Sequence, residues 1–223
     1  MHVTILRTVG DKPWSEYVPF LPLLTPERQE KIARCRAERG RIQSLLTELL
    51  IRHEAADGKA VAFTYNEYGK PHLLSPSGMH FSVSHTSHYI AYTAGIVPVG
   101  VDIEYRRSVN LNIAKHYFSK GEQEVLRESR DPVLDFYRIW TAKEAILKRN
   151  GTGFFTGVKL PDVCDHALRP YLAEHVGADF VLAVCGARHL RPLRIRMLDE
   201  TDLLREFSEM RSDGVAVEQL TLS

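Results

Sequence analysis

Two spacings of apolar residues divide the chain into predicted strands and predicted helices. Short segments in which apolar and polar residues alternate predict strands, and longer ones with apolar residues three and four positions apart predict helices. The predicted strands are 3–8, 62–65, 80–85, 89–95, 99–105, 178–185 and 193–198; the predicted helices cover 39–56, 112–118, 131–149 and 201–210, with two more starting at 25 and 119. Residues 213–223 are expected to form a tail or an edge strand.

Two helix starts carry recognisable capping signals. Asp131 and Pro132 fit the N-cap and first-turn positions, and the glycine-containing run 150–153 ends that helix. Ser119 and Glu122 fit a capping box, in which the Glu122 carboxylate binds the amide of Ser119. This spacing indicates a structural role for Glu122.

The predicted strand 99–105 ends in two acids. Side chains alternate along a strand, so its valines and isoleucine share one face and Gly100, Asp102 and Glu104 share the other. The two carboxylates would lie about 6.6 Å apart. The pattern predicts a cation site, with Gly100 leaving room for a ligand beside the backbone. The alternative is a half-buried strand whose solvent face is acidic.

The predicted strand 80–85 carries hydroxyls on one face. Phe81 and Val83 are expected to face the core, and Ser82 and Ser84 to face outward. His85 ends the strand, where an imidazole and two hydroxyls can hold anionic oxygens. A zinc site is the weaker interpretation, because the histidine spacing there matches no usual zinc pattern.

Basic residues cluster in the helix that starts at residue 25. Arg28, Lys31 and Arg34 recur every third residue and can share one face. Such a stripe is typical of a solvated helix face, and its functional interpretation is a phosphate-binding edge.

The predicted helix 131–149 places unlike groups on one face. Trp140, Glu144 and Lys148 are four residues apart. A plain Glu-to-Lys pair, worth roughly 0.2–0.5 kcal/mol, explains the two charges. The functional alternative is that Glu144 adds a third carboxylate to Asp102 and Glu104.

Composition limits the class of protein. The 223 residues are 44% hydrophobic and 26% charged with a net charge of +1, which is typical of a soluble globular protein. The balance disfavours a protein built to bind nucleic acid or a membrane surface. Cys35, Cys164 and Cys185 are isolated, and no signal peptide or membrane span is evident, so we expect a cytoplasmic protein. Walker loops, nucleophile elbows and repeats are absent from the sequence.

Four short motifs, taken in order, resemble the surfactin-type 4′-phosphopantetheinyl transferases. They are Gly69-Lys70-Pro71, Phe81-Ser82-Val83-Ser84-His85, Gly100-Val101-Asp102-Ile103-Glu104 and the run from Trp140 to Lys148. The resemblance extends from about Thr25 to Gly153 and includes the Phe-Ser-Lys run before Glu122. Each motif is weak alone, whereas all four in this order are specific.

The resemblance implies an α+β fold and a reaction. Two similar α/β halves, 1–98 and 99–223, would be related by a pseudo-twofold axis, with coenzyme A in the cleft between them. The 4′-phosphopantetheine arm of coenzyme A would move to a serine of an apo acyl or peptidyl carrier protein, releasing adenosine 3′,5′-bisphosphate. One chain supplies both sides of the cleft, so we expect a monomer.

The same resemblance implies roles for individual residues. The implied Mg²⁺ ligands are Asp102, Glu104 and Glu144; the implied coenzyme A contacts are Arg28, Lys31, Lys70, Ser84, His85 and Lys148. Lys148 and His85 would also neutralise charge on the reacting phosphate. Lys143 would point toward the ligand or the incoming serine.

The catalytic base and one nucleotide contact stay open. Glu144 is the first choice for the base and Glu122 the reserve. Gln43 stands where the family often has an arginine, and Arg39 or Arg41 could replace it. Two other functions remain: a metal-dependent phosphohydrolase acting on a diphosphate, which would need no carrier, and a non-catalytic carrier-binding module.

Overall fold

The computed structural model describes residues 1–8, 10, 12–74, 78–153, 159–187, 190 and 192–212. A four-stranded sheet has the order β4-β5-β1-β9, a three-stranded sheet the order β6-β8-β7, and β2 and β3 form a two-stranded sheet. The strands are β1 His2–Arg7, β2 Phe63–Tyr65, β3 Pro71–Leu73, β4 His80–His85, β5 Tyr89–Gly95, β6 Gly100–Tyr105, β7 Leu172–Val176, β8 Phe180–Cys185 and β9 Arg194–Asp199. The mixture of helices and sheets confirms the α+β class.

Six α-helices accompany these sheets in the described chain. They are α1 Pro26–Arg34, α2 Glu38–Ala56, α3 Ala114–Tyr117, α4 Lys120–Glu128, α5 Pro132–Asn150 and α6 Glu200–Ser212. Helix α5 begins and ends where the sequence predicts: the Asp131 side chain accepts from Leu134 N, and Gly151 closes the helix with a φ of 77°. None of the described helices is long and apolar enough to cross a membrane.

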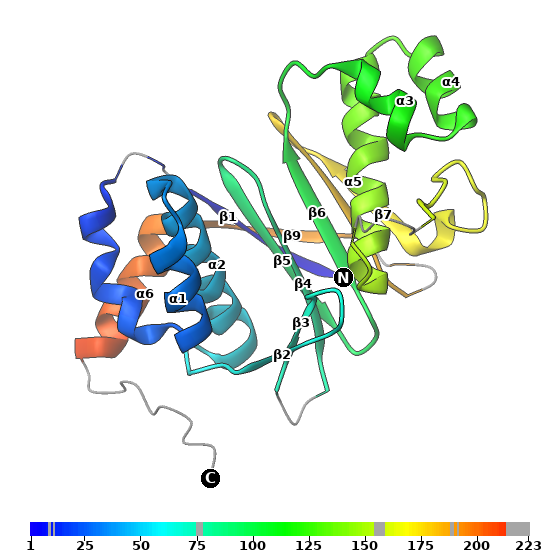
Figure 1. Cartoon of the computed structure of the whole chain (residues 1–223). Coiled ribbons are helices and arrows are strands. Elements are labelled where there is room, and N and C mark those ends of the chain that lie inside the picture. Colours follow the sequence, from blue (N-terminus) through cyan, green and yellow to red (C-terminus); the bar gives the residue numbers. More distant parts are fainter. Residues whose placement is uncertain are drawn as a thin grey trace.

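The larger sheets pack face to face between two layers of helices. Val3 and Ile5 of β1 share a core with Val101 and Ile103 of β6. The other face of the four-stranded sheet packs on α1, α2 and α6, and the other face of the three-stranded sheet packs on α5 (Figure 1). Strands β4, β5 and β6 are therefore each covered on both faces. This arrangement determines how deeply the site residues are buried.

The end of the chain returns to the first half. Strand β9 pairs in parallel with β1, and α6 buries Leu203, Leu204 and Phe207 in the core beside α2. The predicted boundary at residue 98 therefore does not separate the two sheets. The helix predicted at 201–210 is confirmed as α6, and its apolar stripe completes the first core while its other face is exposed. The predicted tail 213–223 lies outside the described residues.

Gly100 allows a helix, and not a ligand, to approach β6. A Cβ added at Gly100 would lie 1.9 Å from the carbonyl oxygen of Ala145 and 2.4 Å from the amide nitrogen of Arg149. Both atoms belong to the backbone of α5, so any larger residue would force the helix away. The prediction that this glycine makes room for a ligand is corrected: it brings α5 against the acidic strand.

Candidate active site

The site is built where β4, β6 and α5 meet. Lys148 Nζ lies 2.7 Å from Asp102 Oδ1 and 2.7 Å from Ser84 Oγ. Ser84 Oγ also donates to Asp102 Oδ1 at 2.7 Å. These three side chains come from three separate elements and close a triangle. Lys148 pairs with the strand acid, so the plain helical pair with Glu144 is not the contact that forms.

Asp102 is more buried than the sequence suggests. Only 3% of the residue is exposed, because β6 lies between the other sheet and α5. Its second oxygen, Oδ2, is buried with no hydrogen-bond partner among the described residues. An unpartnered carboxylate oxygen is costly in a folded protein and is a frequent mark of a binding position. The alternative of an acidic strand face open to solvent is therefore wrong for Asp102.

Glu104 and Glu144 share the electrostatic environment of Asp102. Burial, together with the negative charges of Asp102 and Glu144, raises the pKa of Glu104 to about 7. Burial, followed by the charge of Asp102, likewise raises the pKa of Glu144 to about 7. The positive charge of Lys148 lowers the pKa of both glutamates. The three predicted carboxylates therefore lie within electrostatic range of one another.

These acids do not form a ready-made metal centre. Within the described part of the chain, no group of three or more His, Cys, Asp or Glu side chains is arranged to hold a metal ion. The chemistry of the donors nevertheless fits a divalent cation, since Asp102 Oδ2 lacks a partner and two neighbouring carboxylates repel it. The positive charge beside Asp102 in this structure is the ammonium of Lys148.

Basic residues gather on the open side of this triangle. Partial desolvation lowers the pKa of His85, and nearby positive charges lower it further. These charges belong to Lys148, Lys31 and Arg28. The structure thus brings together predicted anion contacts from α1, β4 and α5. Arg28 is also anchored, because its Nε lies 3.0 Å from Oε2 of the buried Glu48.

Comparisons with known proteins show which family the chain belongs to. The model of the 4′-phosphopantetheinyl transferase superfamily matches residues 98–197. The 4′-phosphopantetheinyl transferase ffp of Bacillus subtilis is 30% identical over 218 residues, which cover 87% of this chain and 96% of that protein. The chain belongs to this family. The 4′-phosphopantetheinyl transferase Sfp of Bacillus subtilis strain 168 is 29% identical over the same shares of each chain. The resemblance inferred from the four motifs is confirmed.

Lys70 occupies a different position from the one its motif predicts. In this phosphopantetheinyl transferase its Nζ donates to three backbone carbonyls, those of Val99 at 3.3 Å, Lys148 at 2.5 Å and Arg149 at 3.2 Å. The last two belong to the C-terminal turn of α5, where a cation is favoured. All three ammonium protons are used, so Lys70 ties the β2–β3 hairpin to the start of β6 and to the C-terminal turn of α5.

Glu122 and Lys143 form a saturated pair that the sequence did not place together. Lys143 Nζ lies 2.7 Å from Glu122 Oε2, and the two side chains are 1% and 0% exposed. Glu122 also accepts from the amides of Ser119 at 2.7 Å and Val163 at 2.8 Å, which confirms the predicted capping box. Buried in this way, neither residue reaches a substrate. This burial argues against the predicted role of Glu122 as a reserve base and that of Lys143 as a ligand contact.

Gln43 stands where the family often has an arginine. It and the nearby Arg39 and Arg41 all bind backbone carbonyl oxygens. Gln43 Nε2 donates to Thr86 O at 2.6 Å, Arg39 donates to the carbonyl of Ser87, and Arg41 Nε donates to Cys35 O at 2.7 Å. Gln43 thus ties α2 to the end of β4. Arg39 and Arg41 therefore already have structural partners.

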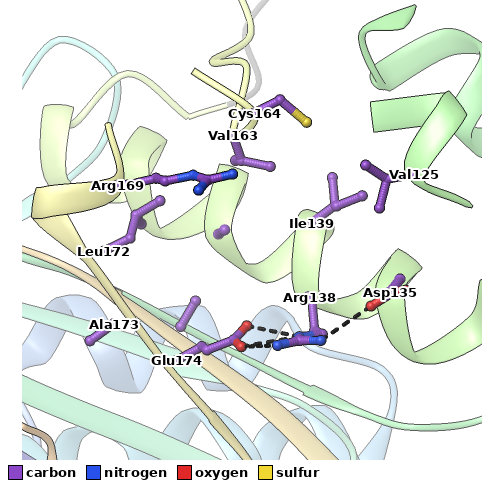
Figure 2. Close-up of a pocket in the computed structure, with 12 residues that line it drawn as sticks. Val125, Asp135, Arg138, Ile139, Val163, Cys164, Arg169, Leu172, Ala173 and Glu174 are labelled. Carbon is purple, nitrogen blue, oxygen red and sulfur yellow. Dashed lines mark hydrogen bonds and ion pairs between the residues drawn. The ribbon is translucent and has the colours of Figure 1, made fainter. Parts of the chain in front are cut away.

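Two cavities lie on either side of α5. One of about 230 Å³ separates the β2–β3 hairpin from the end of α5 and is lined by Lys70, Lys148 and Gly151, residues of both halves. A larger one of about 430 Å³ lies on the opposite side of the helix (Figure 2). Its charged residues largely neutralise one another, since Arg138 pairs with both Glu174 and Asp135. The smaller cavity adjoins the Asp102 triangle and is the better candidate for ligand binding.

Sequence reasoning missed the burial of the β4 hydroxyls. Ser82 and Ser84, expected to face outward, are each 5% exposed because they face β6. The alternation itself is correct, since Phe81 and Val83 pack toward the helical core. What the pattern could not show is that a second sheet covers the polar face.

Proposed function

We propose that this protein transfers the 4′-phosphopantetheine arm of coenzyme A to a serine of an apo acyl or peptidyl carrier protein. The Lys148–Asp102–Ser84 triangle carries the proposal, because it joins β4, β6 and α5 beside two further acids and several cations. A diphosphate needs such an arrangement: positive groups for its oxygens and carboxylates for a bridging cation. Family membership supplies the reaction.

Asp102, Glu104 and Glu144 would hold Mg²⁺ in this proposal. The free Oδ2 of Asp102 and the repulsion among the three acids are the observations that support it. Magnesium is bound by oxygen ligands and would neutralise charge on the diphosphate. Because Lys148 already neutralises part of Asp102, metal binding and the position of the lysine would depend on each other.

In the proposed reaction, three side chains would move a proton or stabilise charge. A bond forms between the carrier serine oxygen and the β-phosphorus, and the bond from that phosphorus to the bridging oxygen breaks, so adenosine 3′,5′-bisphosphate leaves. Glu144 would accept the serine proton, directly or through a water, because it would lie beside the proposed cation and the reacting phosphate. Lys148 and His85 would stabilise charge on the phosphate oxygens.

The apolar and basic surroundings complete the proposal. Arg28 and Lys31 would contact phosphate groups of coenzyme A, and the cavity of about 230 Å³ would receive part of the ligand. We further propose a cytoplasmic monomer, in keeping with the free cysteines Cys35, Cys164 and Cys185. Analytical ultracentrifugation would test the oligomeric state.

Mass spectrometry of a carrier protein tests the proposed reaction. Incubation of wild-type protein with Mg²⁺, coenzyme A and an apo carrier should add one phosphopantetheine group to the carrier and release one adenosine bisphosphate. Asp102→Asn and Glu144→Gln should each slow this by at least 10²-fold. Arg127→Gln, which removes an exposed charge paired with Glu124, is the matched control and should retain full activity.

Nucleotide release without a carrier separates the proposal from its rival. A phosphohydrolase would cleave coenzyme A in the presence of Mg²⁺ alone and would release free phosphopantetheine. Hydrolysis at the rate seen with carrier present would overturn the transferase assignment.

A further inference from the structure

A buried carboxylate of α2 lies behind the basic face of α1. The side chain of Glu48 is 1% exposed, and both of its oxygens are bound. Oε1 accepts from the Thr25 amide at 2.5 Å, and Oε2 accepts from the Thr25 hydroxyl at 3.1 Å and from Arg28 Nε at 3.0 Å. Thr25 is the N-cap residue of α1, a position where a carboxylate is favoured by the helix dipole. Glu48 therefore attaches the start of α1 to α2.

Arg28 is held by one edge of its guanidinium. Nε binds Glu48, and Nη1 lies 3.4 Å from the hydroxyl of Ser44, one turn before Glu48 on α2. Nη2 makes no hydrogen bond within the part of the chain that the structure describes. The guanidinium is planar and presents its donors in a rigid fork, so a fixed Nε also fixes the direction of the terminal nitrogens. The Arg28 charge lies within electrostatic range of His85 and Lys31.

We propose that Glu48 is a positioning residue for coenzyme A: it holds Nε of Arg28 so that the terminal nitrogens stay available to a phosphate group. The inference rests on the proposed function, in which Arg28 contacts a phosphate of coenzyme A. It gives a role to a residue outside the four sequence motifs. Ordering a long side chain on binding costs affinity, and a guanidinium already fixed by a buried partner avoids that cost.

Charge alone predicts the opposite effect of Glu48. A carboxylate beside Arg28 cancels part of the positive potential that attracts a phosphate. If Glu48 acted only through its charge, removing that charge would tighten the binding of coenzyme A. If Glu48 positions Arg28, the same change weakens binding. The sign of the change in Kd therefore distinguishes the two effects.

Glu48→Gln separates the Arg28 contact from the attachment of α1. A glutamine amide has one acceptor oxygen and one NH₂ donor. With the oxygen toward the Thr25 amide, the NH₂ group can donate to the Thr25 hydroxyl, but it faces the N–H of Arg28 Nε, which is another donor. The variant therefore keeps α1 attached to α2 and releases the guanidinium.

Calorimetry with coenzyme A and no carrier measures the effect. The Kd of Glu48→Gln should rise roughly tenfold, because a charged hydrogen bond to phosphate loses its fixed geometry. At saturating coenzyme A its kcat should stay within about twofold of wild type. Thr25→Val removes another partner of the same carboxylate and keeps the Arg28 pair, so the Kd of this control should stay within about threefold.

A double variant separates positioning from a general structural role. In an Arg28→Gln background, Glu48→Gln should change Kd by less than about twofold, because the side chain that Glu48 positions is absent. An equal loss in both backgrounds would make Glu48 purely structural. Tighter or unchanged binding in Glu48→Gln alone would also overturn the proposal.

A crystal structure of wild-type protein with coenzyme A tests the same contact and needs no variant to fold. Nε of Arg28 should stay on Glu48 while a terminal nitrogen contacts a phosphate oxygen, and an arginine that leaves Glu48 on binding refutes the proposal. Wild-type protein that binds no coenzyme A would refute the proposed function as well. Wild-type protein that binds it, with a Kd that Glu48→Gln does not change, refutes only the positioning role.

Discussion

Helix α5 carries two lysines with opposite properties, one buried and one partly exposed. Lys143 and Lys148 are five residues apart and therefore point about 140° apart around the helix. Lys143 is 1% exposed and pairs with a glutamate whose oxygens are all bound. Lys148 is 29% exposed and pairs with an aspartate that keeps one oxygen free. A saturated ion pair builds the fold, whereas an unsaturated one leaves capacity for a ligand.

The comparison separates residues that sequence alone treats alike. Both lysines lie in one motif, next to or near Glu144, and both are candidates for phosphate binding on charge alone. The number of partners that each group already has distinguishes them. The predictions below test this distinction in order of expected size.

The largest effect should come from breaking the saturated pair. Lys143→Met leaves Glu122 buried without its cation, which should lower the free energy of unfolding by about 3–5 kcal/mol. Urea denaturation followed by circular dichroism measures this. Lys115→Met, at an exposed lysine of α3, is the control and should change stability by less than about 0.5 kcal/mol.

A double-mutant cycle adds a check on that result. In the cycle of Lys143→Met and Glu122→Gln, the two losses should overlap by about 1 kcal/mol or more, since either change removes the same ion pair. Strict additivity would show that the residues act independently and would contradict the assignment.

An intermediate effect is expected at Lys70, whose three partners are backbone carbonyls. Lys70→Met should cost about 1–2 kcal/mol, because it removes a cation from the C-terminus of α5 and the tie between the halves. The KM for coenzyme A should rise less than in Lys148→Met. A larger rise in Lys70→Met would restore Lys70 as a phosphate contact.

A smaller effect of opposite sign should follow from removing charge at the unsaturated site. In metal-free buffer at pH 8, Glu144→Gln should raise the free energy of unfolding by about 1 kcal/mol, since it relieves burial of a charge beside Asp102. Thermal unfolding measures the gain. Destabilisation would show that Glu144 has a favourable partner in the folded protein.

The smallest effect concerns a third, partly exposed pair. His53 contacts Glu54 at 3.1 Å and Glu206 at 2.9 Å, and its hydrogen bond to Glu54 is the main cause that raises the pKa of His53. A raised histidine pKa stabilises the fold below pH 6.5, and the contribution disappears as pH rises through the folded-state pKa. His53→Gln should therefore cost about 0.5 kcal/mol at pH 6 and nothing measurable at pH 9. Equal costs at both pH values would contradict the linkage.

Local signals in the sequence predict where single helices and strands lie. They do not predict which other elements cover each helix or strand. The caps of α5 and the box at Ser119 and Glu122 depend on neighbouring residues, so spacing predicts them. The burial of Ser84 and Asp102 depends on contacts between β4, β6 and α5, which no local pattern reports. For the same reason the sequence analysis does not predict β7, which pairs with β8. It predicts a strand at 193–198 but not its pairing with β1.

The position of β9 also has a consequence for how the protein is made. Strand β1 lies between β5 and β9, so β1 gains its last neighbour only after residue 199 has been synthesised. At translation rates of about 5–20 residues per second, roughly 5 to 20 s pass between completion of β5 and of β9. Until then, the edge of β1 that β9 covers has no strand partner in the growing chain, and an unpaired strand edge can pair with other chains.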